Sequence, residues 1–276
     1  MHGQLGDGTR TDKSSFVQVI LGYAKAMDAG VKHSLVVMQD GSMWATGSNK
    51  YGQLGDGTTQ DRNRFVQLVA NDAIAVATGE RHSMILKRDA SVWATGCNQH
   101  GQLGDGSIES TTWFVEVIAS QATAVDAGSS HSMVLKADGS VWFTGDNTYG
   151  QLGYGSSELQ SSFVKVIPSE AQAIAAGSYH SMVMMRDGSV WATGKNEFGE
   201  LGNGQKASPG NFVPVVSSGA RAVAAGGFHS MVVMVDGMVQ ATGANLEGQL
   251  GDGSFISKNT FLTVLQPDYR KWYAEI

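Results

Sequence analysis

Short apolar segments alternate with turn residues along this chain, and the alternation repeats every 49 residues. A glycine-rich string marks each repeat. It reads GQLGDG at Gly3, Gly52, Gly101 and Gly248, GQLGYG at Gly150, and GELGNG at Gly199. A fixed period of this size is typical of repeat proteins, in which each unit buries its apolar surface against its neighbours. The pattern therefore predicts a single repetitive domain.

Each repeat predicts four short strands, which we call A to D. Strand A holds small residues, as in residues 73–79, and strand B begins two residues later with a His-Ser pair, as in 82–87. An Asp-Gly pair at the end of strand B, such as Asp138-Gly139, favours a tight hairpin into strand C, as in 92–96. Strand D follows the glycine-rich string with Phe and alternating valines, as in 65–68. Strands B and C are apolar at consecutive positions, which indicates that both faces of each sheet are covered.

Small antiparallel four-stranded sheets that pack in sequence make a β-propeller, and this is the all-β fold that we predict. Five full blades are expected, at residues 24–69, 73–118, 122–167, 171–216 and 220–265. Residues 14–20 match strand D and predict an extra end strand, and residues 266–276 form a tail outside the repeat. Two arrangements stay open. Five blades could close a small ring, or the chain could be an incomplete array, which the unmatched strand slightly favours.

Recurrent aromatic and imidazole side chains are expected to serve the fold. The tryptophans are predicted to fill the wide gap between blades, and they are Trp44, Trp93, Trp142 and Trp191. The histidines of the His-Ser pairs are His33, His82, His131, His180 and His229. A metal site or a catalytic base needs unlike groups that converge once, so an identical histidine in every blade favours a hydrogen bond to the backbone of the same or the next blade.

No other motif predicts a catalytic residue, a metal site or a cofactor. The glycine-rich strings lack the Lys-Ser/Thr of a phosphate loop and the carboxylate spacing of a calcium loop. Their aspartates are expected to hold the turn through bonds to the backbone, and these are Asp7, Asp56, Asp105 and Asp252. Cys97 stands at a position that varies between repeats, which argues against a nucleophile.

The composition of the chain disfavours several classes of binding partner and several cellular locations. The net charge is -6 and the isoelectric point is about 5.6, so binding to nucleic acid or to an anionic membrane is disfavoured. A single cysteine permits no internal disulfide, and no apolar run reaches the roughly 18 residues of a membrane span. The start of the chain lacks a signal-peptide pattern. We therefore expect a cytoplasmic or nuclear protein.

The repeat resembles the regulator of chromosome condensation family. The resemblance rests on GSSHS at 128–132, DGS at 138–140 and GDNTYGQLG at 145–153, and it recurs over nearly the whole chain. One departure is a threonine just before the strand-C glycine, where the family often has tryptophan; it stands at Thr46, Thr95, Thr144, Thr193 and Thr242. The resemblance implies a propeller, commonly of seven blades, that binds other proteins.

The positions that differ between repeats are the candidates for function. In an up-and-down blade the A-B and C-D loops emerge on the same face. The A-B loops carry Lys32, Arg81, Tyr179 and Phe228, and the C-D loops carry Tyr51, His100, Tyr149 and Phe198. Aromatic and basic residues are enriched at protein interfaces, so we predict a partner-binding face. The alternative is that these side chains only cover the next blade.

The function predicted first is a non-enzymatic scaffold that binds a protein partner. One alternative is guanine-nucleotide exchange on a Ran-like small GTPase, although the even repeat length leaves no room for an added wedge. A lectin-like or inhibitor module is a further alternative, but a sugar site or an active site would need a single cluster of unlike polar groups, which the repeats do not show. An unpaired end blade would also favour self-association.

Overall fold

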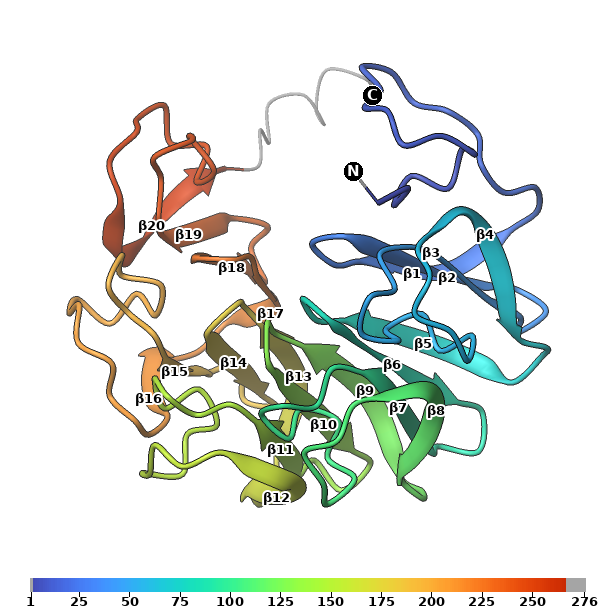
Figure 1. Cartoon of the computed structure of the whole chain (residues 1–276). Coiled ribbons are helices and arrows are strands. Elements are labelled where there is room, and N and C mark those ends of the chain that lie inside the picture. The colour runs from blue at the N-terminus through green and yellow to red at the C-terminus, as the bar shows by residue number, and fades with distance from the viewer. Residues whose placement is uncertain (1, 267–276) are drawn as a thin grey trace, which may run out of the picture. The chain divides into compact units, whose positions relative to one another are not determined.

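The computed structural model describes residues 2–266. These residues form twenty β-strands and no helix. The strands make five antiparallel sheets of four, each with its strands in chain order (Figure 1). The predicted all-β fold of propeller blades is therefore confirmed.

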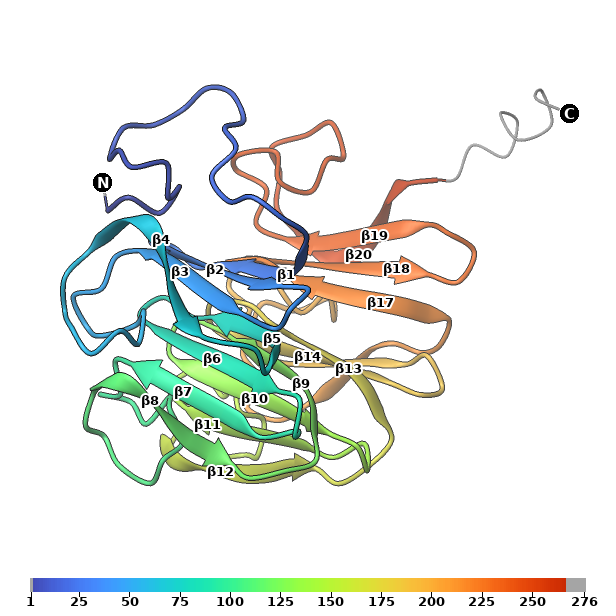
Figure 2. The same ribbon diagram turned by 90° about the vertical axis from the view of Figure 1, so that its right-hand side faces the viewer.

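The chain divides into two compact units, which we describe separately. The first unit comprises residues 1–148 and 157–170 and holds three blades. Blade 1 consists of β1 (Ala24–Ala29), β2 (His33–Met38), β3 (Met43–Gly47) and β4 (Arg62–Val69). Blade 2 consists of β5 (Ala73–Thr78), β6 (His82–Lys87), β7 (Val92–Gly96) and β8 (Thr111–Ile118). Blade 3 consists of β9 (Ala122–Ala127), β10 (His131–Lys136), β11 (Val141–Gly145) and β12 (Gln160–Ile167). In Figure 2 the three sheets of this unit lie face to face.

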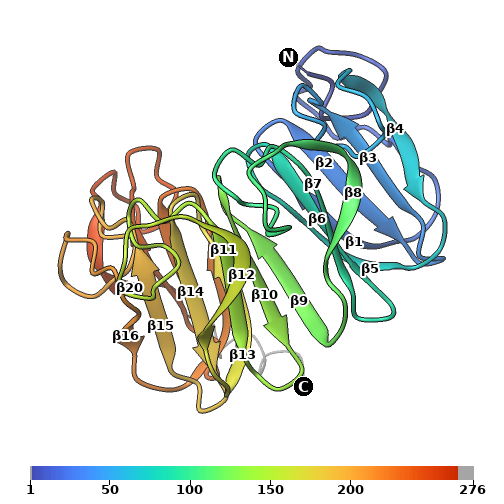
Figure 3. The same cartoon turned by 60° about the horizontal axis from the view of Figure 1, so that its bottom comes forward.

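The second unit comprises residues 149–156 and 171–276 and holds two blades. Blade 4 consists of β13 (Ala171–Ala176), β14 (His180–Met185), β15 (Val190–Gly194) and β16 (Val213–Val216). Blade 5 consists of β17 (Ala220–Ala225), β18 (His229–Met234), β19 (Val239–Gly243) and β20 (Lys258–Leu265). Figure 3 shows the strands of blade 4 side by side in chain order.

The turn between strands B and C explains the Asp-Gly pairs. Gly139 adopts a positive φ of 78°, and the Asp138 carboxylate accepts a hydrogen bond from the Ser140 N–H at 2.9 Å. Blade 2 has Ala90 in place of the glycine, and Ala90 keeps the same left-handed conformation with φ at 66°. The aspartate bond is retained there, because Asp89 accepts from the Ser91 N–H at 3.0 Å. The repeat thus imposes this turn even without glycine.

The glycine-rich loops before residue 205 pack onto the blade that follows them. In blade 2 the Thr95 hydroxyl lies 3.0 Å from the Gly52 carbonyl oxygen of the preceding loop. The same hydroxyl lies 3.1 Å from the carbonyl oxygen of Thr111 at the start of strand D. Gly55 faces the ring of Phe114 so closely that a Cβ would overlap it. A small hydroxyl side chain before the strand-C glycine therefore fastens the incoming loop, which accounts for threonine where the family often has tryptophan.

The apolar cores lie between successive sheets. Between blades 1 and 2 the fully buried side chains include Leu35, Met43 and Ile85. In the second unit Met182, Val190 and Val232 form the corresponding core between blades 4 and 5. Aliphatic and methionine side chains occupy these cores, so each blade is stabilised by its neighbours, as repeat architectures require.

Residues 14–20 do not form the extra strand that we predicted. The glycine-rich loop before them is in its usual place, because the Gly3 carbonyl oxygen lies 3.0 Å from the Thr46 hydroxyl and the backbone of Asp7 forms a β-bridge with that of Arg64. Residues 14–20 have no strand C beside them in the described chain, so their backbone lacks a partner. Phe16 is fully exposed as a result. Apart from Gln266, the predicted tail at 266–276 lies outside the described residues.

Candidate functional site

The A-B loop of one blade contacts the C-D loop of the blade before it. In the first unit, Arg81 on an A-B loop donates through Nη1 to the Tyr51 hydroxyl at 3.2 Å. In the second unit, Tyr179 on an A-B loop lies 5.6 Å from Tyr149, measured between ring centroids. The sequence-based expectation that these two loops share a face therefore holds inside each unit.

Four aromatic residues form a continuous cluster in the second unit, which we call the aromatic cluster. Tyr149, Tyr179, Phe228 and Phe198 follow one another with centroid distances of 5.6, 6.1 and 5.9 Å. Two of these contacts are edge-to-face, the geometry that aromatic pairs prefer. Phe228 is 38% exposed and the other three rings are half-buried. The cluster thus covers the next blade and still presents apolar surface.

Lys195 lies against the aromatic cluster. Its Nζ is 5.0 Å from the ring centre of Tyr149, 5.8 Å from Tyr179 and 5.6 Å from Phe228. The same ammonium pairs with Glu197 at 2.9 Å, and this hydrogen bond raises the pKa of Lys195. The equivalent residues in the other repeats are Ser48, Cys97, Asp146 and Ala244. A permanent cation in contact with three rings therefore occurs once among the repeats.

Glu200 lies buried beneath the same loop. Its Oε2 accepts a hydrogen bond from the Phe198 N–H at 2.8 Å, whereas its Oε1 is buried without a partner among the described residues. The other repeats have glutamine here, and Gln53 accepts the equivalent bond from the Tyr51 N–H at 3.0 Å. Burial raises the pKa of Glu200. Sequence reasoning missed Lys195 and Glu200, although the change from GQLG to GELG was an available signal for Glu200.

The predicted residues of the first unit gather around Tyr51 but include no comparable cluster of rings. Lys32 is exposed and lines a hollow together with Tyr51 and Arg81. The Arg81 guanidinium lies 5.0 Å from the centre of the Tyr51 ring. His100 is also exposed, and none of its described contacts joins it to these three residues. Three of the four candidates in this unit are therefore brought together.

The recurrent histidines link successive blades. Nε2 of His33 lies 2.9 Å from Oγ of Ser83, and the same distance separates His82 from Ser132 and His180 from Ser230. The imidazole partner is thus a serine side chain of the next blade, whereas we expected the backbone. Burial lowers the pKa of His33 to about 4, that of His82 to about 3 and that of His131 to about 4. His229 is only half-buried.

The tryptophans are half-buried and do not fill the blade interfaces by themselves. Each indole N–H donates to the serine that follows the B-C turn, as in Trp93 to Ser91 at 3.0 Å. The equivalent donors are Trp44, Trp142 and Trp191. Lys87 lies over the Trp93 ring at 4.2 Å. Trp142 also packs on the core between blades 2 and 3.

The glycine-rich loops use their aspartates as expected. The Asp56 carboxylate accepts from the Thr58 N–H at 3.0 Å and from Nδ2 of Asn49 at 2.8 Å. Asn203, which replaces aspartate in its repeat, accepts in the same way from the Gln205 N–H at 3.0 Å. No group of three His, Cys, Asp or Glu side chains within residues 2–266 is placed to hold a metal ion. In the same residues no helix has the length and apolar character that crossing a membrane would require.

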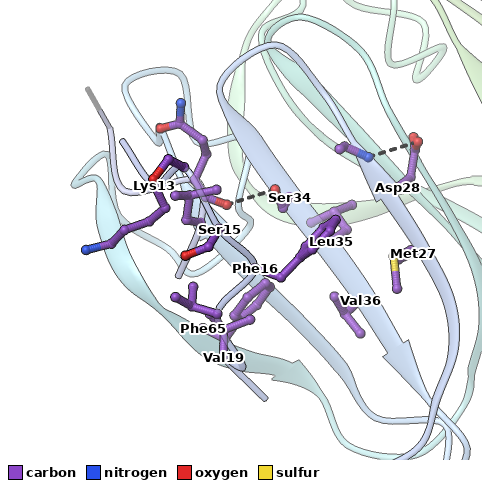
Figure 4. A pocket seen from close by; sticks show the side chains of 15 residues that line it. Lys13, Ser15, Phe16, Val19, Met27, Asp28, Ser34, Leu35, Val36 and Phe65 are labelled. Atoms are coloured by element: carbon purple, nitrogen blue, oxygen red, sulfur yellow. Dashed lines mark hydrogen bonds between the residues drawn. The ribbon is translucent and has the colours of Figure 1, made fainter. Parts of the chain in front are cut away.

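An apolar groove lies beside blade 1, between residues 4–19 and strands β1 and β2. Figure 4 shows Phe16, Met27, Leu35 and Val36 among its lining side chains. Phe16 is fully exposed and Met27 is 70% exposed. In the other described blades of this unit the corresponding face of strand B is covered by the preceding blade. The groove is therefore an unpaired blade face.

Comparisons with known proteins agree with this architecture. The family model described as an RCC1-like domain matches residues 1–272. No curated protein sequence matches the chain. Among solved structures, human WBSCR16 is 21% identical with a TM-score of 0.79, over 89% of this chain and 67% of that one. Yeast RCC1 (Prp20), solved with Kap60, is 19% identical with a TM-score of 0.75, over 87% of this chain and 60% of that one.

A second structure, of Prp20p from Saccharomyces cerevisiae, gives the same identity of 19% and TM-score of 0.75, over 87% of this chain and 62% of that one. The chain thus spans less than two thirds of the length of the yeast protein in these structures. At these identities the likeness concerns the fold.

Proposed function

This chain belongs to the RCC1-like domain family, and on that premise we propose that it is a non-enzymatic scaffold that binds a protein partner through its A-B and C-D loops. The aromatic cluster is the main contact in this proposal. Rings of Tyr and Phe supply large apolar area at a low cost in side-chain entropy, and such residues dominate binding energy at protein interfaces. The four rings are fixed by one another and by Lys195, so little ordering is needed when a partner binds.

The observation that carries the proposal is the partial exposure of rings that a purely structural role would bury. Phe228 is 38% exposed, although it packs on both Tyr179 and Phe198. The solved yeast relative Prp20p has been studied for its binding to Gsp1p and histones, which are properties of that protein. They support a protein as the class of partner. Nucleotide exchange on a small GTPase is a more specific form of the proposal that the chain binds a protein partner, and a nucleotide-release assay would test it separately.

A photo-crosslinking experiment tests the proposal. We place p-benzoylphenylalanine at position 228 in the aromatic cluster, and at position 235 as a control. Val235 is 70% exposed and lies in a B-C turn. We expect a reproducible crosslinked protein only with the probe at position 228. The product should disappear when Tyr179→Ser is added. Equal crosslinking from both positions, or a product that persists with Tyr179→Ser, would count against the aromatic cluster as the contact.

The open face of blade 1 supports a second proposal, self-association with a second copy. The last loop, residues 248–253, has the same GQLGDG sequence as residues 3–8, which pack on Thr46 of blade 1. A Cβ at Gly251 would meet nothing within 4 Å, whereas the matching loop glycines elsewhere face a phenylalanine of the next blade. A second copy could therefore present residues 248–265 to the groove in Figure 4, in place of residues 3–20.

Light scattering coupled to size-exclusion chromatography tests self-association. The mass of the wild-type chain should rise with concentration, because one blade face binds another head to tail. Gly251→Val should abolish the rise, since its side chain would overlap the phenylalanine of an acceptor blade. A control at an exposed loop position, Lys206→Val, should keep it. A monomeric mass at every concentration would rule out this proposal and would leave the aromatic cluster untouched.

A further inference from the structure

A hollow with basic walls lies at the loop end of blades 1 and 2. Residues 48–61 of one C-D loop, the A-B loops at Lys32 and Arg81, and the segment at residues 2 and 10 line it. Its volume is about 680 Å³. Four cationic side chains come from separate parts of the chain, namely Arg10, Lys32, Lys50 and Arg81. The chain as a whole has a net charge of -6, so the positive charge of this hollow is opposite in sign to that of the whole chain.

The two carboxylates of the hollow are already engaged. Asp61 lies 2.8 Å from the His2 imidazole and accepts a hydrogen bond from the Asn49 N–H at 2.8 Å. Glu80 pairs with Arg81 at 3.1 Å. Lys32 and Lys50 have no carboxylate within 4.0 Å in the described chain, and the same holds for Arg10. Three cations therefore face the hollow without an ion-pair partner of their own.

Arg81 is held in place before any ligand arrives. Its Nη1 donates to the Tyr51 hydroxyl at 3.2 Å, and its guanidinium lies 5.0 Å from the centre of the Tyr51 ring. Lys50 lies 5.7 Å from the centre of the same ring. The Nε–Nη2 edge of this guanidinium faces Glu80 Oε1 at 3.1 Å, so a ligand carboxylate that binds there takes the place of Glu80. Because Tyr51 already fixes the guanidinium, this exchange costs little side-chain freedom.

We propose that this hollow binds an acidic, extended segment of a protein partner, so that Asp or Glu carboxylates pair with Lys32, Lys50 and Arg81. The inference deepens the proposed function, since it assumes a protein partner at the A-B and C-D loops. The cations come from three separate segments, which suits several carboxylates along a chain more than one compact anion. In this proposal the aromatic cluster of the second unit supplies apolar contact with the partner, and the hollow makes binding favour partners with acidic segments.

Fluorescence polarisation with a defined probe tests this inference. The probe is a fluorescein-labelled peptide of four Glu-Asp-Gly units, and its uncharged counterpart has four Gln-Asn-Gly units. We compare the whole chain with the double variant Lys32→Gln/Arg81→Gln. The matched control is Lys25→Gln/Arg88→Gln, which removes the same charge from exposed positions outside the hollow. We expect about tenfold weaker binding of the acidic probe by the first variant only.

Each result has a definite meaning. Binding of the acidic probe that is lost with Lys32→Gln/Arg81→Gln, kept in the control and absent for the uncharged probe supports the inference. Equal weakening in both variants, or no binding by the wild type at low salt, overturns it. Tighter binding of a twelve-nucleotide oligothymidine through the same residues would assign the hollow to nucleic acid instead. Tyr179→Ser/Phe228→Ser should leave probe binding unchanged, so failure of the proposed function stays distinguishable.

Discussion

His82 donates a hydrogen bond through Nε2 to Oγ of Ser132 in the next blade, over 2.9 Å. The direction follows from the serine, whose own proton is given to the Gln102 carbonyl oxygen at 2.7 Å. Nδ1 of His82 has no hydrogen-bond partner among the described residues, as the unprotonated nitrogen of this tautomer should. A Cβ at Gly79 would overlap the imidazole ring. The histidine is therefore a neutral link between two sheets.

Replacing Ser132 should weaken this link. Ser132→Ala leaves the buried His82 N–H and the Gln102 carbonyl without their partner, and such a loss costs about 1–3 kcal/mol. The matched control is Ser34→Ala in blade 1, because the Ser34 hydroxyl donates to the Gln4 carbonyl oxygen at 2.9 Å and has no histidine partner among residues 2–266. We expect Ser132→Ala to lower the urea midpoint more than Ser34→Ala does. Equal midpoints would mean that the link contributes little.

The buried histidines should make the fold sensitive to mild acid. Burial lowers the pKa from 6.5 to about 4 for His33 and His131 and to about 3 for His82. Below pH 6.5 the unfolded chain therefore binds protons that the folded chain does not, and the free energy of unfolding falls as pH falls. The loss at pH 5 is up to about 2 kcal/mol for each histidine.

Thermal unfolding between pH 7.5 and 4.5 measures this dependence. The variant His82→Gln cannot titrate, so its melting temperature should fall less steeply with decreasing pH than that of the wild type. The comparison uses slopes, so it remains valid if the variant is less stable at every pH. Parallel slopes would show that His82 gains its proton as readily in the folded chain as in the unfolded one.

The sequence predicted the blades well because equivalent strands in successive blades have the same pattern of buried positions, so the same residue types recur. Strand B at 82–87 and strand C at 92–96 have the predicted bounds, since the His-Ser pair and the B-C turn mark their ends. The predicted strand at residues 14–20 does not form, for a reason that the local sequence pattern does not reveal. A strand D needs a strand C beside it to accept its hydrogen bonds. The segment around Phe16 has a strand-D sequence, but no strand C lies beside it in the described chain.

The candidate site was predictable only in part. Tyr149, Tyr179, Phe198 and Phe228 were identified because they differ between repeats on loops that share a face. The cation that joins them was missed, since Lys195 lies directly after the end of strand C and contacts the rings only after the loops fold. The role of Thr95 was equally hidden, because its hydroxyl acts on a loop 43 residues earlier in the chain.

Glu200→Gln should stabilise the protein at neutral pH. Burial raises the pKa of Glu200, so above its ordinary value of 4.5 the unfolded chain releases a proton that the folded chain retains, and stability falls as pH rises. Glutamine removes this loss and is the residue that the other repeats use. We expect a higher melting temperature for the variant at pH 7 and convergence with the wild type below pH 4.5. A variant less stable at pH 7 would show that Glu200 is favourable when ionised.

Alanine at two equivalent loop glycines should separate backbone strain from packing between blades. Gly55 and Gly251 both adopt positive φ, at 79° and 69°, so alanine is strained at either position by about 1 kcal/mol. A Cβ at Gly55 would also overlap Phe114 of the next blade, whereas at Gly251 it would meet nothing within 4 Å. Overpacking of this kind adds about 1–3 kcal/mol.

Gly55→Ala should therefore lower the urea midpoint clearly more than Gly251→Ala. The measurement belongs at low protein concentration, because a second copy seated against residues 248–253 would give Gly251 the same close neighbour that Gly55 has. A Gly251→Ala penalty that grows with concentration and approaches that of Gly55→Ala would reveal such a neighbour. Equal penalties at every concentration would instead show that the strained φ dominates and that packing on Phe114 tolerates an added methyl group.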